Sequence, residues 1–581
     1  GLFTMKTILR FIKPYKCLCF FTLLVMVLDV AGGLLIPTIT ADMINVGVGG
    51  GDMQYLIRRG IHMLAITLIT SLGALAGSYL SADLSAKIGR DMRNALYDKS
   101  LAFSADDFEQ FGTGSMITRT LNDVNIIQQG VVWFIQMVLP VPAVCLMGII
   151  MAFSIDTMMG FLLIGATVFV ILLAVLVTRK ASLIFDRLQG FLDRMNIVLR
   201  ENVTGVRVIR AFNKEKFEEK RMKKSFEDYA ESAIQANRLF AGLESAALFA
   251  INLCIVFILW LGGNRIGAGF MKIGDITALT QYAVMILFYI IMAQMVFILI
   301  PRAMICVRRI SAVPYHTPEI EDGPTAARAL KTGLNEVVRF DHVSFRFADA
   351  DEDTLGDLNF ACKRGETTAI IGSTGSGKST IAKLILRFHD VTSGSILFNG
   401  CDIHGMPQAE LRERIAYVPQ KAWLFSGTIA DNLRYGDRNA DKKQMEHALR
   451  TAQAGFVSSL PDGLYARVAQ GGTNFSGGQK QRLSIARALM KRADLYIFDD
   501  SFSALDFKTD AALRKALKNE TAGAAVLIIA QRISTIMNAE QIIVLEDGRI
   551  AGAGSHAALM ESCPVYRDIA KSQMKGEACD E

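Results

Sequence analysis

Six long apolar stretches dominate the first 300 residues of the chain. They lie at about 17–41, 60–83, 130–153, 157–178, 245–263 and 277–300. Each is close to the roughly 20 residues that an α-helix needs to cross the hydrocarbon core of a bilayer. Two of the polar segments between them are long, at about 84–129 and 179–244, and the others are short. This pattern predicts six membrane-spanning helices.

Basic residues predict the orientation of these helices. The N-terminal segment and the two long polar segments contain 4, 5 and 14 Lys and Arg residues, whereas the three short connections contain 2, 0 and 2. The positive-inside rule therefore places the N-terminus and the long segments in the cytoplasm. Residues 83–102 and 185–203 keep a helical composition beyond the membrane. We expect helices that extend into the cytosol and carry motion away from the bilayer.

The pattern changes after the sixth apolar stretch. Residues 314–333 contain Pro and Gly without any periodicity and are typical of a linker. Beyond them, short apolar runs predict buried strands and one apolar-periodic segment predicts a helix. The strands are expected at 368–371, 495–499 and 525–530, and the helix at 381–388. We therefore expect an all-α six-helix transmembrane domain at 1–315, a linker at 316–333, an α/β domain at 334–575 and a tail at 576–581.

Composition agrees with a chain that lies partly in a membrane. The 581 residues are 51% hydrophobic, with a net charge of +6 and a mean hydropathy of +0.32. The nine cysteines are scattered and form no CxxC pair. We expect reduced thiols rather than a disulfide framework or a zinc site, and no nucleic-acid partner.

The segment GSTGSGKS at 372–379 predicts a phosphate-binding loop, because a strand precedes it and a helix follows it. Its glycines let backbone N–H groups turn toward phosphate oxygens. Lys378 is expected to reach the β- and γ-phosphates, and Ser379 to ligate Mg²⁺ together with Asp499 at the end of a later strand. We predict a P-loop NTPase domain that uses ATP and Mg²⁺. The expected contacts are Gly372, Ser373, Thr374, Gly375, Ser376, Gly377, Lys378, Ser379 and Thr380.

Three further segments narrow the prediction to one family. FSGGQKQRLSIARAL (475–489), YVPQ (417–420) and SALD (503–506) follow the P-loop in the order found in ATP-binding cassette (ABC) transporters, which the chain resembles over nearly its whole length. Segments 111–124 and 203–215 resemble the membrane domain of exporter-type half-transporters. The resemblance implies that two such domains sandwich ATP. Ser476, Gly477, Gly478 and Gln479 would then contact the ATP of the partner, and Gln420 would sense Mg²⁺ and the attacking water.

Three residues depart from the pattern of this family. Phe347 stands where an aromatic residue, usually Tyr, stacks on adenine, and a role in the strand core is the alternative. Asp500 stands where the family has a catalytic Glu, and its carboxylate falls about 1.5 Å short. Gln531 replaces a His that contacts the γ-phosphate. Misplacement of a catalytic group by about 1 Å lowers rates by roughly 10²-fold. The resemblance therefore implies an impaired ATPase half-site, with neutral drift as the alternative.

Two impaired sites in a homodimer would make a slow pump. We therefore predict a heterodimer with a second, homologous half-transporter, resembling the degenerate-site subunit of bacterial heterodimeric multidrug exporters. The expected function is ATP-driven export of amphipathic or hydrophobic compounds from the cytoplasm or the inner leaflet of a bacterial cytoplasmic membrane. The nucleotide-binding domain would face the cytoplasm. A lipid or peptide exporter of the same architecture and an ATP-gated channel or regulatory subunit are the alternatives.

The membrane half offers candidates for the substrate pathway. Asp29 lies inside the first apolar stretch, where an ionisable side chain is costly and commonly marks a pathway. A solvated structural role is the alternative. The sixth stretch is rich in Met and aromatic residues that adapt to varied apolar ligands. Helix packing and lipid contact would also explain them. The candidates are Asp29, Tyr282, Met285, Tyr289 and Met292.

Overall fold

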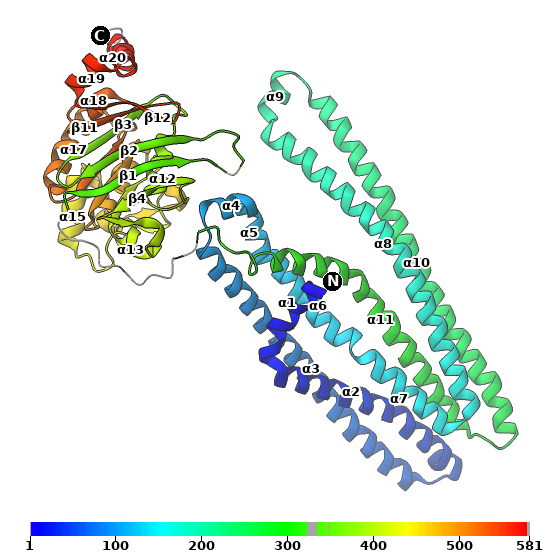
Figure 1. Ribbon diagram of the computed structural model, residues 1–581. Helices are drawn as coiled ribbons and strands as arrows, with labels where there is room; N and C mark the ends of the chain where they lie inside the picture. The colour runs from blue at the N-terminus through cyan, green and yellow to red at the C-terminus, as the bar shows by residue number, and fades with distance from the viewer. Residues whose placement is uncertain (1, 321, 323–333, 348, 578–581) are drawn as a thin grey trace. The chain divides into compact units, whose positions relative to one another are not determined.

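The computed structural model describes residues 2–320, 322, 334–347 and 349–577, which form two compact units (Figure 1). The helical unit comprises the residues up to Ala102 together with Phe111–Thr317, and the α/β unit comprises Phe103–Gln110 and the residues from Pro318 onward. Most of the predicted linker and most of the predicted tail lie outside the described residues.

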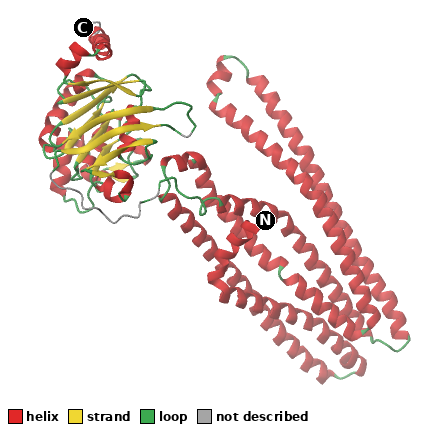
Figure 2. Cartoon of the chain, in the orientation of Figure 1, coloured by secondary structure: helices red, strands yellow, loops and turns green. Residues whose placement is uncertain are grey.

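The described part of the helical unit contains helices and short connections (Figure 2). The long helices are α2 (Lys16–Asp42), α3 (Met53–Leu101), α7 (Pro140–Ile155), α8 (Thr157–Thr204), α10 (Glu215–Gly267) and α11 (Ile273–Ser311). The shorter helices are α1 (Leu2–Ile12), α5 (Thr113–Thr118), α6 (Val124–Trp133) and α9 (Val206–Ala211), and π-helical turns lie at Met43–Val48, Arg119–Asp123 and Phe134–Val138.

Within the described residues, six helical segments are long and apolar enough to cross a membrane, which confirms the six predicted spans. They are Lys6–Val48, Met53–Leu101, Thr113–Ile155, Thr157–Val177, Ser245–Gly267 and Ile273–Gln294. α11 packs against α2, α7, α8 and α10. α7 approaches it closely at Gly148, where an added Cβ would lie 2.8 Å from Ile286 Cδ1.

α8 and α10 form a long hairpin that closes through α9 (Figure 1). α8 has 48 residues and α10 has 53, so each is more than about 70 Å long, whereas the bilayer core is about 30 Å thick. α3 likewise continues to Leu101. The predicted helical extensions at 83–102 and 185–203 are therefore present. Large apolar side chains remain exposed near the α9 end of the hairpin: Ile197, Leu199, Val203, Val208, Phe212 and Phe217.

Two main sheets build the α/β unit. A six-stranded sheet has the order β12-β11-β3-β10-β9-β6, in which only β12 is antiparallel to its neighbour. Its strands are β3 (Thr367–Gly372), β6 (Ile415–Val418), β9 (Leu495–Asp499), β10 (Ala525–Ile529), β11 (Gln541–Glu546) and β12 (Arg549–Gly554). An antiparallel sheet has the order β2-β1-β4-β5. Its strands are β1 (Glu336–Phe345), β2 (Leu355–Lys363), β4 (Ser393–Phe398) and β5 (Cys401–Asp402), and β7 (Gly427–Thr428) pairs separately with β8 (Arg467–Val468).

The three strands predicted from apolar runs correspond to β3, β9 and β10, all of them buried. The predicted helix at 381–388 is displaced, because α12 spans Lys378–Ile385. It ends early since Arg387 has φ +51°, which a right-handed helix does not admit. The other helices of this unit are α4 (Ala105–Phe111), α13 (Gln408–Glu413), α14 (Ile429–Leu433), α15 (Lys442–Thr451), α16 (Gly477–Leu489), α17 (Phe507–Glu520), α18 (Ile533–Ile536), α19 (His556–Ser562) and α20 (Pro564–Glu577).

Candidate functional site

The predicted phosphate loop connects the buried strand β3 directly to α12. Gly375 and Gly377 have φ values of +89° and +88°, a conformation that favours glycine. A Cβ at Gly377 would also lie 2.6 Å from Leu355 Cδ2. The tip of the loop, from Ser373 to Gly375, is exposed. The loop therefore presents backbone N–H groups at the start of a helix, which is a favourable environment for phosphate.

Lys378 folds back over this loop. Its Nζ donates to the carbonyl oxygens of Gly372 at 2.8 Å and Ser373 at 2.6 Å. Burial lowers the pKa of Lys378, and the negative charges of Asp500 and Asp499 oppose that shift. An ammonium group in this position would gain from an anion at the mouth of the loop.

Asp499 and Ser379 form an oxygen pair at the carboxyl end of β9. Ser379 Oγ donates to Asp499 Oδ1 at 2.8 Å, and the Tyr417 hydroxyl lies 3.4 Å from Asp499 Oδ2. Asp499 is 3% exposed, and burial raises the pKa of its carboxyl while the two hydroxyl groups oppose the shift. A hydroxyl and a carboxylate side by side match the oxygen ligands that Mg²⁺ prefers. These residues fit the predicted metal role.

Asp500 contacts two other predicted residues, Gln420 and Gln531, which come from separate parts of the chain. Its Oδ2 atom accepts from Gln420 Nε2 at 3.3 Å and from Gln531 Nε2 at 3.0 Å. The residue has φ +46°, and its N–H donates to the Ile529 carbonyl, so its backbone is held. Burial raises the pKa of Asp500. The same carboxylate oxygen therefore accepts hydrogen bonds from both amide side chains.

The signature segment caps α16 and faces solvent. Ser476 Oγ accepts from the N–H of Gln479, and Gln479 Oε1 accepts from the N–H of Ser476 at 2.9 Å, which is a reciprocal capping box. Ser476 and Gly477 are exposed, and a Cβ at Gly478 would lie 3.0 Å from the Ala504 carbonyl. Within the described residues, no hydrogen bond joins Ser476–Gln479 to the phosphate loop of the same chain.

Phe347 follows β1 and is half-buried. Its ring makes edge contacts with Phe345 at 4.8 Å and with His389 at 5.4 Å between centroids. The residue thus packs against the core on one side and retains some exposed surface on the other, so stacking on adenine stays a prediction.

The sequence did not point to two residues that support this site. Tyr417 contacts Asp499 from the end of β6, and its place in YVPQ next to the predicted Gln420 could have indicated this. Gln573, on α20, donates to the Gln531 carbonyl at 2.6 Å and accepts from the N–H of Ile533 at 2.8 Å. No sequence signal marks Gln573, because 42 residues separate it from Gln531.

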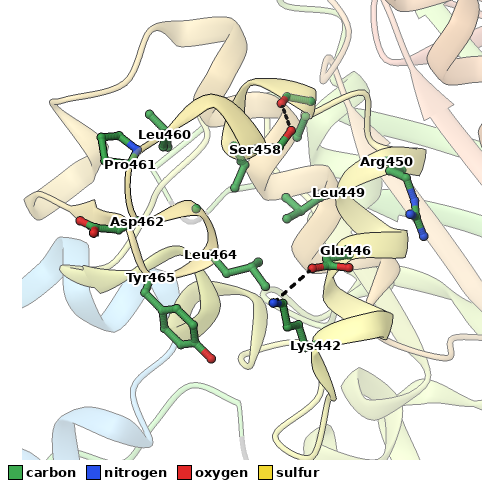
Figure 3. A pocket seen from close by; sticks show the side chains of 14 residues that line it. Lys442, Glu446, Leu449, Arg450, Ser458, Leu460, Pro461, Asp462, Leu464 and Tyr465 are labelled. Atoms are coloured by element: carbon green, nitrogen blue, oxygen red, sulfur yellow. Dashed lines mark hydrogen bonds and ion pairs between the residues drawn. The ribbon is translucent and has the colours of Figure 1, made fainter.

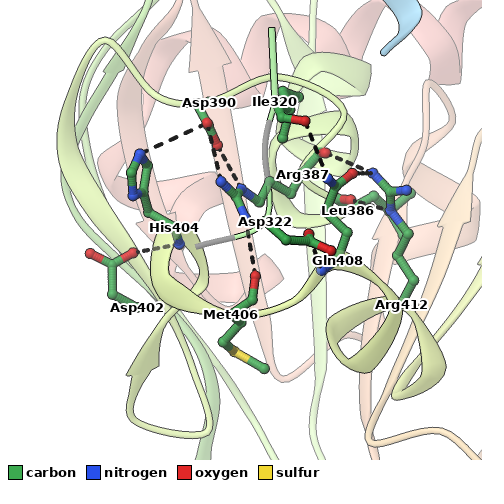
Figure 4. Close-up of polar contacts among 10 residues, drawn as sticks. All are labelled: Ile320, Asp322, Leu386, Arg387, Asp390, Asp402, His404, Met406, Gln408 and Arg412. Atoms are coloured by element: carbon green, nitrogen blue, oxygen red, sulfur yellow. Dashed lines mark hydrogen bonds and ion pairs between the residues drawn. The ribbon is translucent and has the colours of Figure 1, made fainter. Parts of the chain in front are cut away.

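A buried arginine supports the far end of α12 (Figure 4). Arg387 is 1% exposed; its Nε donates to Asp390 Oδ1 at 2.8 Å and its Nη1 to the Met406 carbonyl at 3.1 Å. Arg412 donates in turn to the carbonyls of Leu386 at 3.0 Å and Arg387 at 2.8 Å. The residues that follow α12 are therefore held in place by the guanidinium groups of Arg387 and Arg412.

Asp390→Ala is expected to loosen α12, because it removes one carboxylate that the buried Arg387 guanidinium contacts. Asp390 keeps 30% of its side-chain surface exposed, so we discount the loss to about 1–3 kcal/mol of local opening free energy. Amide hydrogen exchange of the full-length chain should then quicken in α12 by about 5- to 150-fold. Glu446→Ala is the matched control, since the Lys442–Glu446 pair at 3.8 Å is exposed. Equal exchange in both variants would contradict a role for Arg387.

A separate pocket of about 560 Å³ lies between α15 and residues 455–465 (Figure 3). Its lining includes Lys442, Glu446, Leu449, Leu464 and Tyr465. It contains none of the predicted site residues, so the pocket and the predicted nucleotide site are different places on the α/β unit.

The predicted pathway residues lie on α2 and α11, which pack together. Tyr282 is 1% exposed, and its hydroxyl lies 2.7 Å from Thr38 Oγ1, so within this chain it serves helix packing. Four others remain half-buried: Asp29, Met285, Tyr289 and Met292.

Comparison with known proteins gives consistent matches over both units. The profile of the ABC transporter transmembrane region matches residues 18–291, and that of the ABC transporter domain matches residues 355–503. An ABC transporter ATP-binding protein of Mycobacterium tuberculosis is 37% identical over 97% of both chains. An ATP-dependent lipid A-core flippase of Chromobacterium violaceum is 28% identical over 96% of both. The solved structure of a bacterial Atm1-family ABC exporter with ATP bound has the same fold, with a TM-score of 0.81, 23% identity, and coverage of 96% of this chain and 98% of that one.

Proposed function

The chain belongs to the ABC transporter family, and from that premise we propose that it is one subunit of an ATP-driven exporter with a slow nucleotide site of its own. Membership in the family implies ATP binding coupled to transport across a membrane. The main observation in favour of slow hydrolysis at this site is the contact of Asp500 Oδ2 with the amides of Gln420 and Gln531.

The geometry of Asp500 supports retention of ATP without rapid hydrolysis. The glycine-rich loop, the Lys378 ammonium above it and the Ser379–Asp499 oxygen pair support binding of phosphate and Mg²⁺. The catalytic position is different. Asp500 has a short side chain that two neutral amides hold, and Gln531 cannot carry the positive charge of an imidazolium. Bound ATP would therefore stabilise the closed state while water is activated poorly.

A second, homologous subunit would complete the transporter. Ser476 and Gly477 are exposed at the start of α16, where their donors could meet a nucleotide on another chain. The exposed apolar side chains near the α9 end of the hairpin also favour a protein partner, because several large apolar side chains exposed outside a membrane are suited to burial at an interface. The partner would supply a catalytic Glu and a His at the positions that correspond to Asp500 and Gln531 of this chain.

The cargo we favour is an amphipathic or hydrophobic compound taken from the cytoplasm or the inner leaflet. Half-buried Met285, Tyr289 and Met292 on α11 provide an adaptable apolar surface. A lipid is the second candidate, because one of the relatives that match over the whole chain is named a lipid A-core flippase.

The purified full-length chain is expected to bind Mg-ATP and to hydrolyse it poorly, because its binding residues are complete and its catalytic ones are not. Filter binding of radiolabelled ATP, followed by analysis of the bound nucleotide, would show ATP retained rather than ADP. Lys378→Ala is the control and should lose most of the bound nucleotide, since its ammonium interacts with phosphate. Brisk turnover by a verified oligomer of this chain alone would contradict the proposal.

A further inference from the structure

Asp29 lies at the middle of α2, thirteen residues from each end of Lys16–Asp42. That spacing places it about 20 Å from either end of the helix, near the centre of a bilayer about 30 Å thick. Among the six apolar stretches of the sequence, the only other Asp, Glu, Lys or Arg is Asp83, at the very end of the second, and the only His is His62, near its start. The central depth of the membrane half therefore contains a single formal charge.

The neighbours of Asp29 follow from the antiparallel packing of α2 and α11. Thr38 meets Tyr282 at 2.7 Å, and a Cβ at Gly33 would lie 3.1 Å from Met285 Cε. Another turn along the same antiparallel register brings Asp29 opposite Tyr289. Met292 follows Tyr289 on the same face of α11, because it lies at i+3.

Nothing in the described part of the chain neutralises this carboxylate. No hydrogen bond or ion pair involves Asp29 there. The hydroxyl groups of Thr38 and Tyr282, by contrast, form a hydrogen bond with each other. A carboxylate at this depth is costly unless an opposite charge accompanies it. A cation bound beside Asp29 would supply the opposite charge that the described residues do not.

We propose that Asp29, Tyr289, Met285 and Met292 bind a monovalent amphipathic organic cation as transported cargo. This assignment rests on the proposed exporter function and narrows its cargo. The carboxylate supplies the counter-charge, the Tyr289 ring offers a face for cation–π contact, and the two thioethers adapt to an apolar body of variable shape. These four residues together complement a ligand with a hydrophobic body and one positive charge.

Two ions of the same shape and opposite charge test the proposal directly. Tetraphenylphosphonium and tetraphenylborate would be titrated against the full-length chain in nanodiscs of neutral lipid, with empty nanodiscs subtracted. Asp29→Asn, which keeps size and removes charge, should weaken phosphonium binding at least about tenfold and leave borate binding equal or tighter.

Asp29→Glu keeps the charge, and its affinity for phosphonium should remain within about threefold of that of the unchanged chain. Tyr289→Leu should weaken phosphonium binding about threefold to fivefold, and Tyr289→Phe should not.

Phosphonium affinity that is the same in the unchanged chain, Asp29→Asn and Tyr289→Leu would overturn the cation site. So would binding that tracks added anionic lipid instead of residue 29, because the bilayer would then hold the ion. ATP binding is measured on the same samples. Retained ATP binding with phosphonium affinity independent of Asp29 rejects the cargo assignment alone, whereas an unchanged chain that binds phosphonium through Asp29 but no ATP rejects the exporter proposal.

Discussion

Ser476→Arg, made in this chain only and assembled with an unmodified partner, is expected to reduce ATP turnover by about 10²–10³-fold. Ser476 caps α16 with its hydroxyl and lies on an exposed surface. In the proposed heterodimer it faces the ATP of the partner, at the site with the complete set of catalytic residues. Donors placed in advance around a transferring phosphoryl group stabilise its developing charge, and a bulky guanidinium would displace them.

The comparison variant is Lys378→Ala in the same chain. In the proposed heterodimer Lys378 would serve only the slow site, so its loss should reduce nucleotide occupancy there and lower turnover far less than Ser476→Arg does. Ser555→Arg controls for the lost helix cap, because Ser555 caps α19 with the same side chain outside the site. Steady-state ATPase assays of the purified assembly measure all three. If Lys378→Ala abolishes turnover while Ser476→Arg leaves it near normal, the two sites have been assigned in reverse.

Asp500→Glu combined with Gln531→His is expected to raise hydrolysis at this half-site by about 10²-fold. The added methylene carries the carboxylate about 1.5 Å further from the backbone, toward the position from which a water attacks. The imidazole restores a group that can carry positive charge beside the γ-phosphate. The measurement needs a partner whose own catalytic Glu is replaced by Gln, so that the remaining turnover comes from this site.

Each single substitution should recover only part of this gain. Gln531 and Gln420 donate to the same Asp500 oxygen, and residues in one hydrogen-bonded group act non-additively. Asp500→Asn with Gln531→His is the control, because it provides the imidazole without a carboxylate base and should give no increase. If the double variant with Glu is equally inactive, the defect lies elsewhere in the half-site.

The sequence predicted those features that hydrophobic pattern and local motifs determine. The six spans and the strands β3, β9 and β10 were expected because uninterrupted apolar runs have few alternatives to burial in a bilayer or a sheet. The end of α12 was misplaced because the conformation of Arg387 depends on its contacts with Asp390, three residues later, and with Met406 from a later segment.

Within the site, the motif residues were predictable and their supports were not. Ser379, Asp499 and Asp500 lie in segments whose spacing carries information, and the structure brings them to one edge of the sheet. Gln573 reaches Gln531 only through the packing of α20, which no short pattern encodes. The role of each motif residue remains a prediction that the variants above test.

The shared oxygen of Asp500 links two substitutions that would otherwise be independent. A single change to Glu would move the carboxylate away from the position where both amides now meet it, and a single change to His would replace one of those amide donors while the short carboxylate remained. Each single change therefore alters the hydrogen bonds at Asp500 along with catalysis, so its gain stays partial. Selection for faster ATP turnover at this site would favour the two changes together over either one alone.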